Sequence, residues 1–415
     1  MQDEGSRMRE LMSRMRQALP LAGAGLRVKV PLLVAGSAVA MLFALSFVSF
    51  QSARSILQDR IETHFASILQ ARSDDLTGWF AAQERALLIQ AGNSVMQDAL
   101  FEFDSAWIKD KEATRAQVIA DYITDNPHPE KQRHKLEEGD GNRVYARAHK
   151  QYHPPLRRMM TEGDHADIYL VNLDGDVVYS VAKGADFAAN LEAGAMAESG
   201  LGRAYHAALA AEPGTVIFED FAPYGPADRP AGFFATRVTG MGTTIGVAVF
   251  RAAPAALTGM LSKGRQAGSG MRTRLVGADG RVRASSDPGH GAQRMELTKP
   301  LQRVLDGWRV RFARHHGGDG PARLVSMRPV SAFGDSWALV ADIPVAEAMA
   351  PVSRLQAMLL SIVAGFGIAA TVFGVLFSRW LTRPVLQLQG RVAGLRDGDL
   401  ESDVPSRSRR DEVGR

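Results

Sequence analysis

Seven polar side chains in one stretch of the chain have the types that bind a small charged molecule. A lysine or arginine binds a carboxylate, and an aspartate binds an amine. Small-molecule sites are mostly apolar with a few placed polar groups, and tyrosine supplies both kinds of surface. We therefore predict a ligand pocket from Tyr169, Tyr179, Lys183, Asp186, Asp220, Tyr224 and Arg237. The alternative is that the tyrosines are half-buried sheet residues and the charged groups are solvated.

A histidine pair is a second candidate for chemistry. His149 and His153 are four residues apart, the spacing that places two imidazoles on one helix face. The chain has no cysteine to add as a ligand, and Pro154 disfavours a regular helix directly after His153. We predict no metal and no cofactor. The sequence also lacks G-x-S-x-G, P-loop and H-E-x-x-H motifs, so we predict no catalytic residues and no enzymatic activity in this chain.

The pocket candidates lie on predicted strands. Residues 167–172 and 177–181 read as two strands joined by an Asp174-Gly175 turn. Three further strands are predicted over 216–221, 232–238 and 244–250, with a helix over 195–211 before them. The pattern recurs with strands over 274–277, 281–285, 308–313, 322–330 and 336–342. This predicts two tandem α+β modules with antiparallel sheets, at 161–260 (distal to the membrane) and 261–350 (proximal).

A helical region, 54–160, precedes these modules. One proline-free helical pattern runs from Arg54 to about Tyr122 and ends before Pro127 and Pro129. A second stretch, 141–160, is predicted to be broken by the Pro154-Pro155 pair. A further helix is predicted over 344–354.

Two charge-free apolar stretches, 30–53 and 355–378, flank the modules. A helix of about 20 apolar residues crosses a bilayer, so both are predicted to be transmembrane. Basic residues in the 1–29 tail and after residue 378 place both termini in the cytoplasm and residues 54–350 outside it. Cleavage of the first span as a signal peptide is disfavoured because no small-x-small site closes it. Much of the basic excess behind the pI of about 9.3 lies beside the spans, and no nucleic-acid-binding motif is present.

The segment 379–415 resembles part of a HAMP signal linker. The resemblance rests on Pro384, which is predicted to open a helix, on the apolar spacing after it, on Gly398-Asp-Leu400 and on Asp411-Glu-Val-Gly414. It implies two helices that assemble as a four-helix bundle in a dimer. The chain stops where the second helix would begin.

The exported region resembles the double Cache sensors of methyl-accepting chemotaxis proteins. The motifs that carry this resemblance are Tyr145-Ala-Arg-Ala-His149, Tyr152-His-Pro-Pro-Leu-Arg157, Asp167-Ile-Tyr-Leu170, Asp174-Gly-Asp-Val-Val-Tyr-Ser180 and Asp186-Phe187. It implies two PAS-like modules carried by a long N-terminal helix between two transmembrane helices. It also implies that small molecules bind between the distal sheet and the loops that cross it. The arginine–tryptophan pattern of amino-acid-binding members is absent.

These expectations combine into a chemoreceptor of the bacterial inner membrane. A homodimer would sense an extracytoplasmic small molecule and pass the signal through the second span and the HAMP segment to a cytoplasmic signalling module missing here. The same sensor could instead belong to a histidine kinase or a nucleotide cyclase. A third alternative is a truncated receptor that acts only as a binding or heterodimer partner.

Overall fold

The computed structural model describes residues 26–108, 110–227, 229–263, 270–287, 293–315 and 321–396. The chain divides into two compact units. The first takes Met1–Ile61 and Met349–Arg415, and the second takes Glu62–Ala348. The described part of the first unit consists of residues 26–61 of helix α2 (Leu26–Ala91) and helix α11 (Ala350–Arg396).

Among the side chains that the structure describes, both helices of the first unit expose large apolar residues. Met41 is 77% exposed and Ile368 is 68% exposed. The helical segments Gly36–Ala91 and Ala350–Phe377 each contain a window long and apolar enough to cross a membrane, and these windows are 0% and 6% buried. The core helix of a water-soluble protein buries at least one apolar face, and these windows do not.

Helix α11 continues where the sequence predicted a new start. It includes Pro384 and ends at Arg396, so the expectation that Pro384 opens a separate helix is wrong. A helix loses one backbone hydrogen bond at an interior proline and can continue past it. The rest of the HAMP-like pattern, Gly398-Asp-Leu400 and Asp411-Glu-Val-Gly414, lies outside the described residues.

In the second unit the predicted single helix is interrupted twice. After α2 the helices are α3 (Ser94–Ile108), α4 (Lys111–Ile119) and the π-helical turn η1 (Ala120–Thr124). At the first interruption Asn93 Oδ1 accepts a hydrogen bond from the N–H of Val95, 3.0 Å away. At the second Asp110 Oδ1 accepts from the N–H of Ala113, also at 3.0 Å. These side chains satisfy N–H groups that a helix start leaves free.

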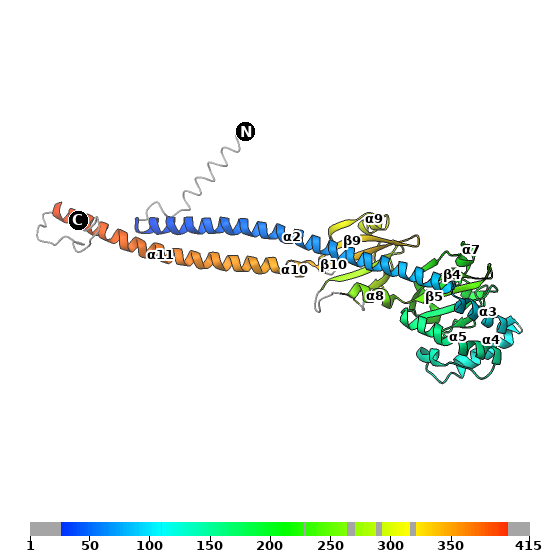
Figure 1. Ribbon diagram of the computed structural model, residues 1–415. Coiled ribbons are helices and arrows are strands. Elements are labelled where there is room, and N and C mark those ends of the chain that lie inside the picture. Colours follow the sequence, from blue (N-terminus) through cyan, green and yellow to red (C-terminus); the bar gives the residue numbers. More distant parts are fainter. Residues whose placement is uncertain are drawn as a thin grey trace, which may run out of the picture. The chain divides into compact units, whose positions relative to one another are not determined.

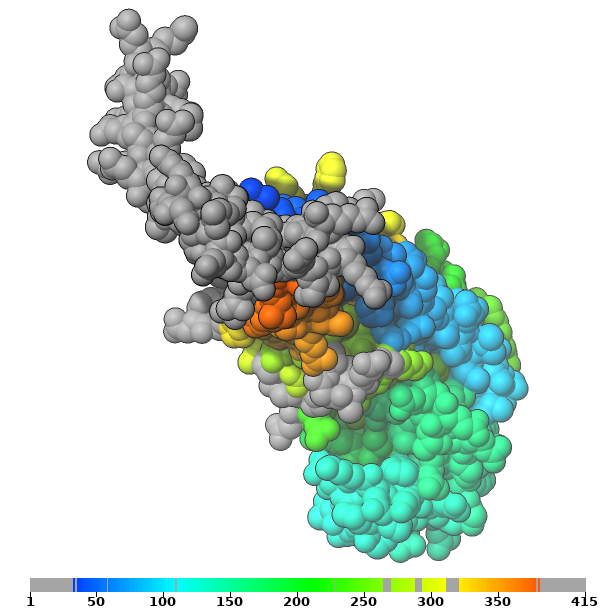
Figure 2. Space-filling model, turned by 90° about the vertical axis from the view of Figure 1, so that its left-hand side faces the viewer, coloured from blue at the N-terminus to red at the C-terminus, as the bar shows by residue number. Residues whose placement is uncertain are grey.

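The predicted break at Pro154-Pro155 is also wrong. The 3₁₀ helix η2 (Glu130–Lys135) leads to α5, which is one helix from Arg143 to Glu162 with both prolines inside it. Its buried face includes Tyr145, His149, Tyr152, His153 and Leu156. Burial of this face offsets the hydrogen bonds that the two prolines cannot make. Figure 2 shows the surface formed by this helical region, in cyan to green.

The first sheet has the strand order β2-β1-β5-β4-β3, and each pair of neighbouring strands in it is antiparallel. The hairpin predicted at Asp174-Gly175 is present, with Gly175 at φ +78°. The sequence predicted one helix over 195–211 between the hairpin and the remaining strands, and the structure has two short helices there, α6 and α7 (Figure 1 labels α7). The elements are β1 (Asp167–Val171), β2 (Val177–Ser180), α6 (Gly194–Ala197), α7 (Gly200–Ala210), β3 (Ile217–Tyr224), the 3₁₀ turn η3 (Gly225–Ala227), β4 (Arg229–Gly240) and β5 (Thr243–Ala252).

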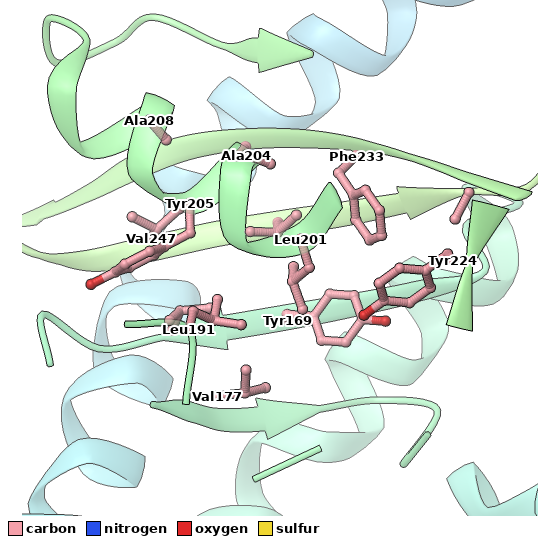
Figure 3. Packing of buried hydrophobic residues seen from close by; sticks show 14 residues of the cluster. Tyr169, Val177, Leu191, Leu201, Ala204, Tyr205, Ala208, Tyr224, Phe233 and Val247 are labelled. Atoms are coloured by element: carbon pink, nitrogen blue, oxygen red, sulfur yellow. The ribbon is translucent and has the colours of Figure 1, made fainter. Parts of the chain in front are cut away.

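Helices cover both faces of the first sheet. Helix α7 packs on β3, β4 and β5, while α3 contacts β2, β4 and β5, and α5 contacts β1. Figure 3 shows the apolar core under α7, where Leu201 and Tyr205 meet Tyr169, Phe233 and Val247 of the sheet.

The second sheet repeats the first, with the order β7-β6-β10-β9-β8. The predicted α+β class with two antiparallel sheets and a long N-terminal helix is therefore confirmed. Helix α8 (Pro254–Ser262) comes between the two sheets in the chain. The other elements are β6 (Arg272–Gly277), β7 (Val282–Ser285), α9 (Lys299–Leu305), β8 (Val310–His315), β9 (Arg323–Ala332), β10 (Asp335–Pro344) and α10 (Val345–Ala348).

Close approach of β1 to β5 leaves no room for a side chain at Gly246. A Cβ atom there would lie 2.3 Å from the carbonyl oxygen of Val171 and 2.8 Å from Leu100, at φ +157°. We expect Gly246→Ala to lower the free energy of unfolding by about 2 kcal/mol or more. Gly259→Ala, in α8 with nothing within 4 Å, is the control and should raise it by about 0.5–1 kcal/mol. Denaturant titrations in which both variants change stability alike would contradict this account.

Candidate ligand site at the end of the first sheet

The strand ends bring several chemical groups to one end of the first sheet. Strand β1 begins at Asp167, which lies opposite Arg251 near the end of β5. Strands β2 and β3 end at Ser180 and Tyr224, and antiparallel pairing places these ends at the same end of the sheet as the start of β1 and the end of β5, with β4 between β3 and β5. The segment after β2, residues 181–187, completes this end of the sheet.

Asp186 is the centre of the cluster on the α7 face. Its Oδ2 accepts hydrogen bonds from the hydroxyls of Tyr169 at 2.6 Å and Tyr224 at 2.7 Å, and Arg251 Nη1 lies 3.4 Å away. In Figure 3 the rings of Tyr169 and Tyr224 come from different strands and their hydroxyls point toward one another. The Asp186 side chain is 0% exposed. Its other oxygen, Oδ1, is buried and has no hydrogen-bond partner among the described residues. A buried carboxylate oxygen of this kind is available to a donor from a ligand.

The electrostatics hold the two tyrosines in their hydroxyl form. Burial raises the pKa of Tyr169 and Tyr224, and the Asp186 charge raises it further. Burial also raises the pKa of Asp167, although the charge of Arg251 opposes this. Burial lowers the pKa of Arg251, but Tyr169 and the two carboxylates outweigh it and the net shift is upward. The cluster therefore presents hydroxyl donors and a guanidinium around one buried carboxylate.

Lys183 belongs to the opposite face of the sheet. Tyr169 pairs with Ser180 and Leu170 pairs with Tyr179, so Tyr169 and Tyr179 project from opposite faces. The Lys183 Nζ lies 4.3 Å from the ring centroid of Tyr179, on the α5 side. The segment 181–187 thus carries Asp186 to one face and Lys183 to the other. Burial lowers the pKa of Lys183 to about 7, while the charge of Asp167 raises it.

The histidine pair lies on this second face without a metal environment. The rings of His149 and His153 are stacked with centroids 4.2 Å apart. His153 Nδ1 accepts from the Tyr179 hydroxyl and its Nε2–H donates to the carbonyl of His134, both at 2.7 Å. Within the part of the chain that the structure describes, no three His, Asp or Glu side chains are grouped as a metal ion requires.

Of the seven predicted pocket residues, the structure places three in a group centred on Asp186 and two in a group centred on Lys183. Tyr169, Asp186 and Tyr224 form the first group, and Tyr179 and Lys183 the second. The two others lie elsewhere. Asp220 accepts from Arg283 Nε and Nη2 at 2.9 and 2.7 Å and from Trp337 Nε1 at 3.1 Å, between the two sheets. Arg237 donates to the carbonyls of Ala208 and Leu209 at the end of α7.

Sequence reasoning missed Arg251 and Asp167. Arg251 interrupts an otherwise apolar run at the end of β5, and this lone charge was the available signal. In the second sheet the equivalent pair has its charges exchanged: the first strand carries Arg272, and the last strand carries its partner Asp342. Two further arginines, Arg274 and Arg323, bind the two carboxylate oxygens of Asp342, so both oxygens are occupied. Asp186 differs because one of its oxygens is left over.

His153 is expected to make the protein sensitive to acid. Burial, with the charge of Lys183, lowers the pKa of His153 to about 3 from 6.5. The unfolded chain therefore takes up this proton first, and stability falls as the pH drops from about 6.5 towards 3. In His153→Gln the slope in this range should be shallower by up to about 1.4 kcal/mol per pH unit. Equal slopes in denaturant titrations from pH 7 to 4 would contradict it.

Similar solved structures include the ligand-binding domain of the Pseudomonas fluorescens chemoreceptor CtaA with L-serine, at 14% identity and TM-score 0.39, covering 69% of this chain and 98% of that one. The ligand-binding domain of the Pseudomonas aeruginosa amino acid chemoreceptor PctB with L-Arg is similar at 14% identity and TM-score 0.41, covering 70% of this chain and 97% of that one. The ligand-binding domain of the Pseudomonas aeruginosa chemoreceptor PctC with GABA is similar at 16% identity and TM-score 0.40, covering 68% of this chain and 99% of that one.

No protein-family model matches the chain, and no curated protein matches it. At these identities and TM-scores the similarity assigns neither a family nor a ligand. The function is therefore inferred from the residues of this chain.

Proposed function

We propose that this chain is the sensor and membrane part of a bacterial chemoreceptor whose small-molecule ligand binds at the Asp186 cluster. The observation that carries the proposal is the buried Asp186 Oδ1, which has no partner among the described residues while Oδ2 accepts from two tyrosines. A ligand amine or hydroxyl donates to Oδ1. Arg251, 11% exposed, is the group for a ligand carboxylate.

Two membrane spans complete the proposed receptor. The apolar, exposed windows of α2 and α11 support spans at 30–53 and 355–378. Residues 54–350 then lie outside the cytoplasm, and the basic flanks keep both termini inside it. As the sequence implies, the receptor is a homodimer in the inner membrane, and its HAMP segment passes the signal to a methyl-accepting output module.

Strand β3 is the proposed link from the ligand site to the second sheet. It carries Tyr224, which binds Asp186, and Asp220, which binds Arg283 of β7 and Trp337 of β10. Asp220 lies in the stretch where the register of β3 against β4 shifts, between Glu219 and Ala222. Such a bulge bends the strand and re-aims a side chain, and here it directs Asp220 towards Arg283 and Trp337. A ligand that draws Tyr224 therefore changes the Asp220 contacts, and a coupling of about 1–3 kcal/mol suffices for signalling.

A thermal-shift screen of the full chain in nanodiscs tests the proposal. Amino acids, amines and carboxylic acids are added singly, and a ligand at 100 times its dissociation constant adds about 2.7 kcal/mol of stability. Asp186→Asn keeps the size of the side chain and removes its charge, so it should abolish the shift. Asp140→Asn, at an exposed position, should keep it. A compound that shifts both variants as it shifts the wild type would place the site elsewhere.

A further inference from the structure

The side chain of Lys183 is enclosed by aromatic rings, and the space that it fills is called the chamber below. Its Nζ is 4.3, 5.1 and 5.5 Å from the ring centroids of Tyr179, Phe187 and Tyr122. The ring of His149 adjoins this wall, 4.4 Å from that of Tyr122 and 5.8 Å from that of Tyr179. Lys183 is 0% exposed. Ring faces at these distances attract a cation, most strongly where water is excluded.

The polar groups of the chamber are acceptors. The Lys183 ammonium donates to the carbonyl oxygen of Ser180. His149 Nδ1–H donates to the carbonyl of Glu137 at 2.7 Å, so its Nε2 carries the lone pair, and this buried atom has no partner among the described residues. Burial and the charge of Lys183 lower the pKa of His149, which keeps it neutral. The carboxylate of Asp167 adds negative charge nearby. Without Lys183, the chamber attracts a cation that has N–H donors.

Lys183 occupies this chamber under strain. Its backbone has φ +59°, a left-handed conformation that costs a non-glycine residue energy. None of the hydrogen bonds of its ammonium goes to a carboxylate among the described residues, although buried cations are ordinarily paired. Outside the chamber, Arg133 Nη1 donates to the Lys183 carbonyl at 3.3 Å. A soluble amine has the same head group and none of this backbone strain.

We propose that this chamber is a second binding site, for an alkylammonium group, and that Lys183 occupies it when no soluble amine is bound. A primary amine has the donors for the Ser180 carbonyl and for His149 Nε2, and its alkyl chain suits the aromatic walls. The carbonyls of His134 and Glu137, bound by His153 and His149, hold residues 130–137 over the chamber as its cover. Displacement of Lys183 frees the segment 181–187, which also carries Asp186.

The test uses the full chain in nanodiscs with n-butylammonium, which reproduces the lysine side chain. Lys183→Ala empties the chamber, and n-butylammonium should raise its melting temperature by several degrees. Wild type should bind about tenfold more weakly, because the tethered lysine competes at an effective concentration in the millimolar range. n-Butanol and butyrate, which lack the positive charge, should give no shift. Adding Tyr179→Leu to Lys183→Ala should remove the shift, and Lys150→Ala, at an exposed lysine of α5, should behave as wild type.

Lys183→Met keeps the chamber filled with a neutral chain and should not bind n-butylammonium. A folded Lys183→Ala that shows no shift at about 100 mM probe, well above the millimolar effective concentration of a tethered group, would overturn the proposal. A larger shift with butyrate, or an equal shift in Lys183→Met, would also overturn it. If Lys183→Ala does not fold alone, n-butylammonium should restore its far-ultraviolet circular dichroism while n-butanol does not. Absence of that rescue, with Lys183→Met folded, counts against the site.

Discussion

Asp186→Ala is expected to lower the free energy of unfolding by about 3–5 kcal/mol. The substitution leaves the hydroxyls of Tyr169 and Tyr224 without the acceptor that both now share. It also leaves the guanidinium of Arg251, 11% exposed, without its 3.4 Å partner. Removing one member of a buried charge cluster costs this much because the remaining groups stay buried: Arg251 keeps only Asp167 as a nearby carboxylate, and two hydroxyl donors lose their acceptor.

The measurement is denaturant unfolding of the full chain in detergent, followed by far-ultraviolet circular dichroism. Asp140→Ala is the matched control, since Asp140 is exposed, and its effect should stay within about 0.5 kcal/mol. Asp186→Asn retains an oxygen for the tyrosines and should fall between the two. A loss below 1 kcal/mol in Asp186→Ala, below any cost expected for a buried charge left unpaired, would mean that the cluster is hydrated and open to water.

Trp337→Ala is expected to cost about 3–5 kcal/mol as well. The indole ring is 1% exposed and stacks on Phe80 of α2, with centroids 5.1 Å apart and ring planes 6° apart. Its Nε1–H donates to Asp220 of β3. One side chain thus joins the long helix, the first sheet and the second sheet, and its removal leaves a large cavity among aromatic rings.

Two further variants separate the parts of this effect. Trp337→Phe keeps an aromatic ring on Phe80 and loses the N–H donor, so it should cost about 1–2 kcal/mol. Trp308→Ala removes an indole that is 70% exposed and should change stability by no more than about 0.5 kcal/mol. If Trp337→Ala were as mild as Trp308→Ala, this indole would not join the two sheets, and the proposed route along β3 would rest on the contacts between Asp220 and Arg283 alone.

The strands were predictable because local signals specify them. An Asp-Gly pair between two short apolar runs fixes a hairpin within a few residues, and both sheets begin with one: Asp174-Gly175 and Asp279-Gly280. The helical region was harder. The break at Gly92-Asn93 and the continuity of α5 through Pro154-Pro155 depend on which faces are buried by other elements. Those contacts are not local in the sequence.

The candidate site was predicted only in part, because some of its contacts join residues that are distant in the sequence. Tyr169, Lys183, Asp186 and Tyr224 lie on or beside predicted strands, and their types indicated a ligand. Alternation along β1 and β2 does not reveal that the segment 181–187 sends Lys183 and Asp186 to opposite faces. Arg251 was missed because its partner, Asp186, lies 65 residues earlier in the chain. Their meeting depends on the strand order, in which β5 lies beside β1.

The account depends on residues 54–350 lying outside the cytoplasm. The chain has no cysteine, so a single introduced cysteine reports its own side of the membrane. Asp140→Cys, at an exposed position of the second unit, should react with a membrane-impermeant maleimide in intact spheroplasts, while Ser13→Cys in the N-terminal tail should react only after lysis. Labelling of Ser13→Cys in intact cells, with Asp140→Cys protected until lysis, would contradict the receptor orientation.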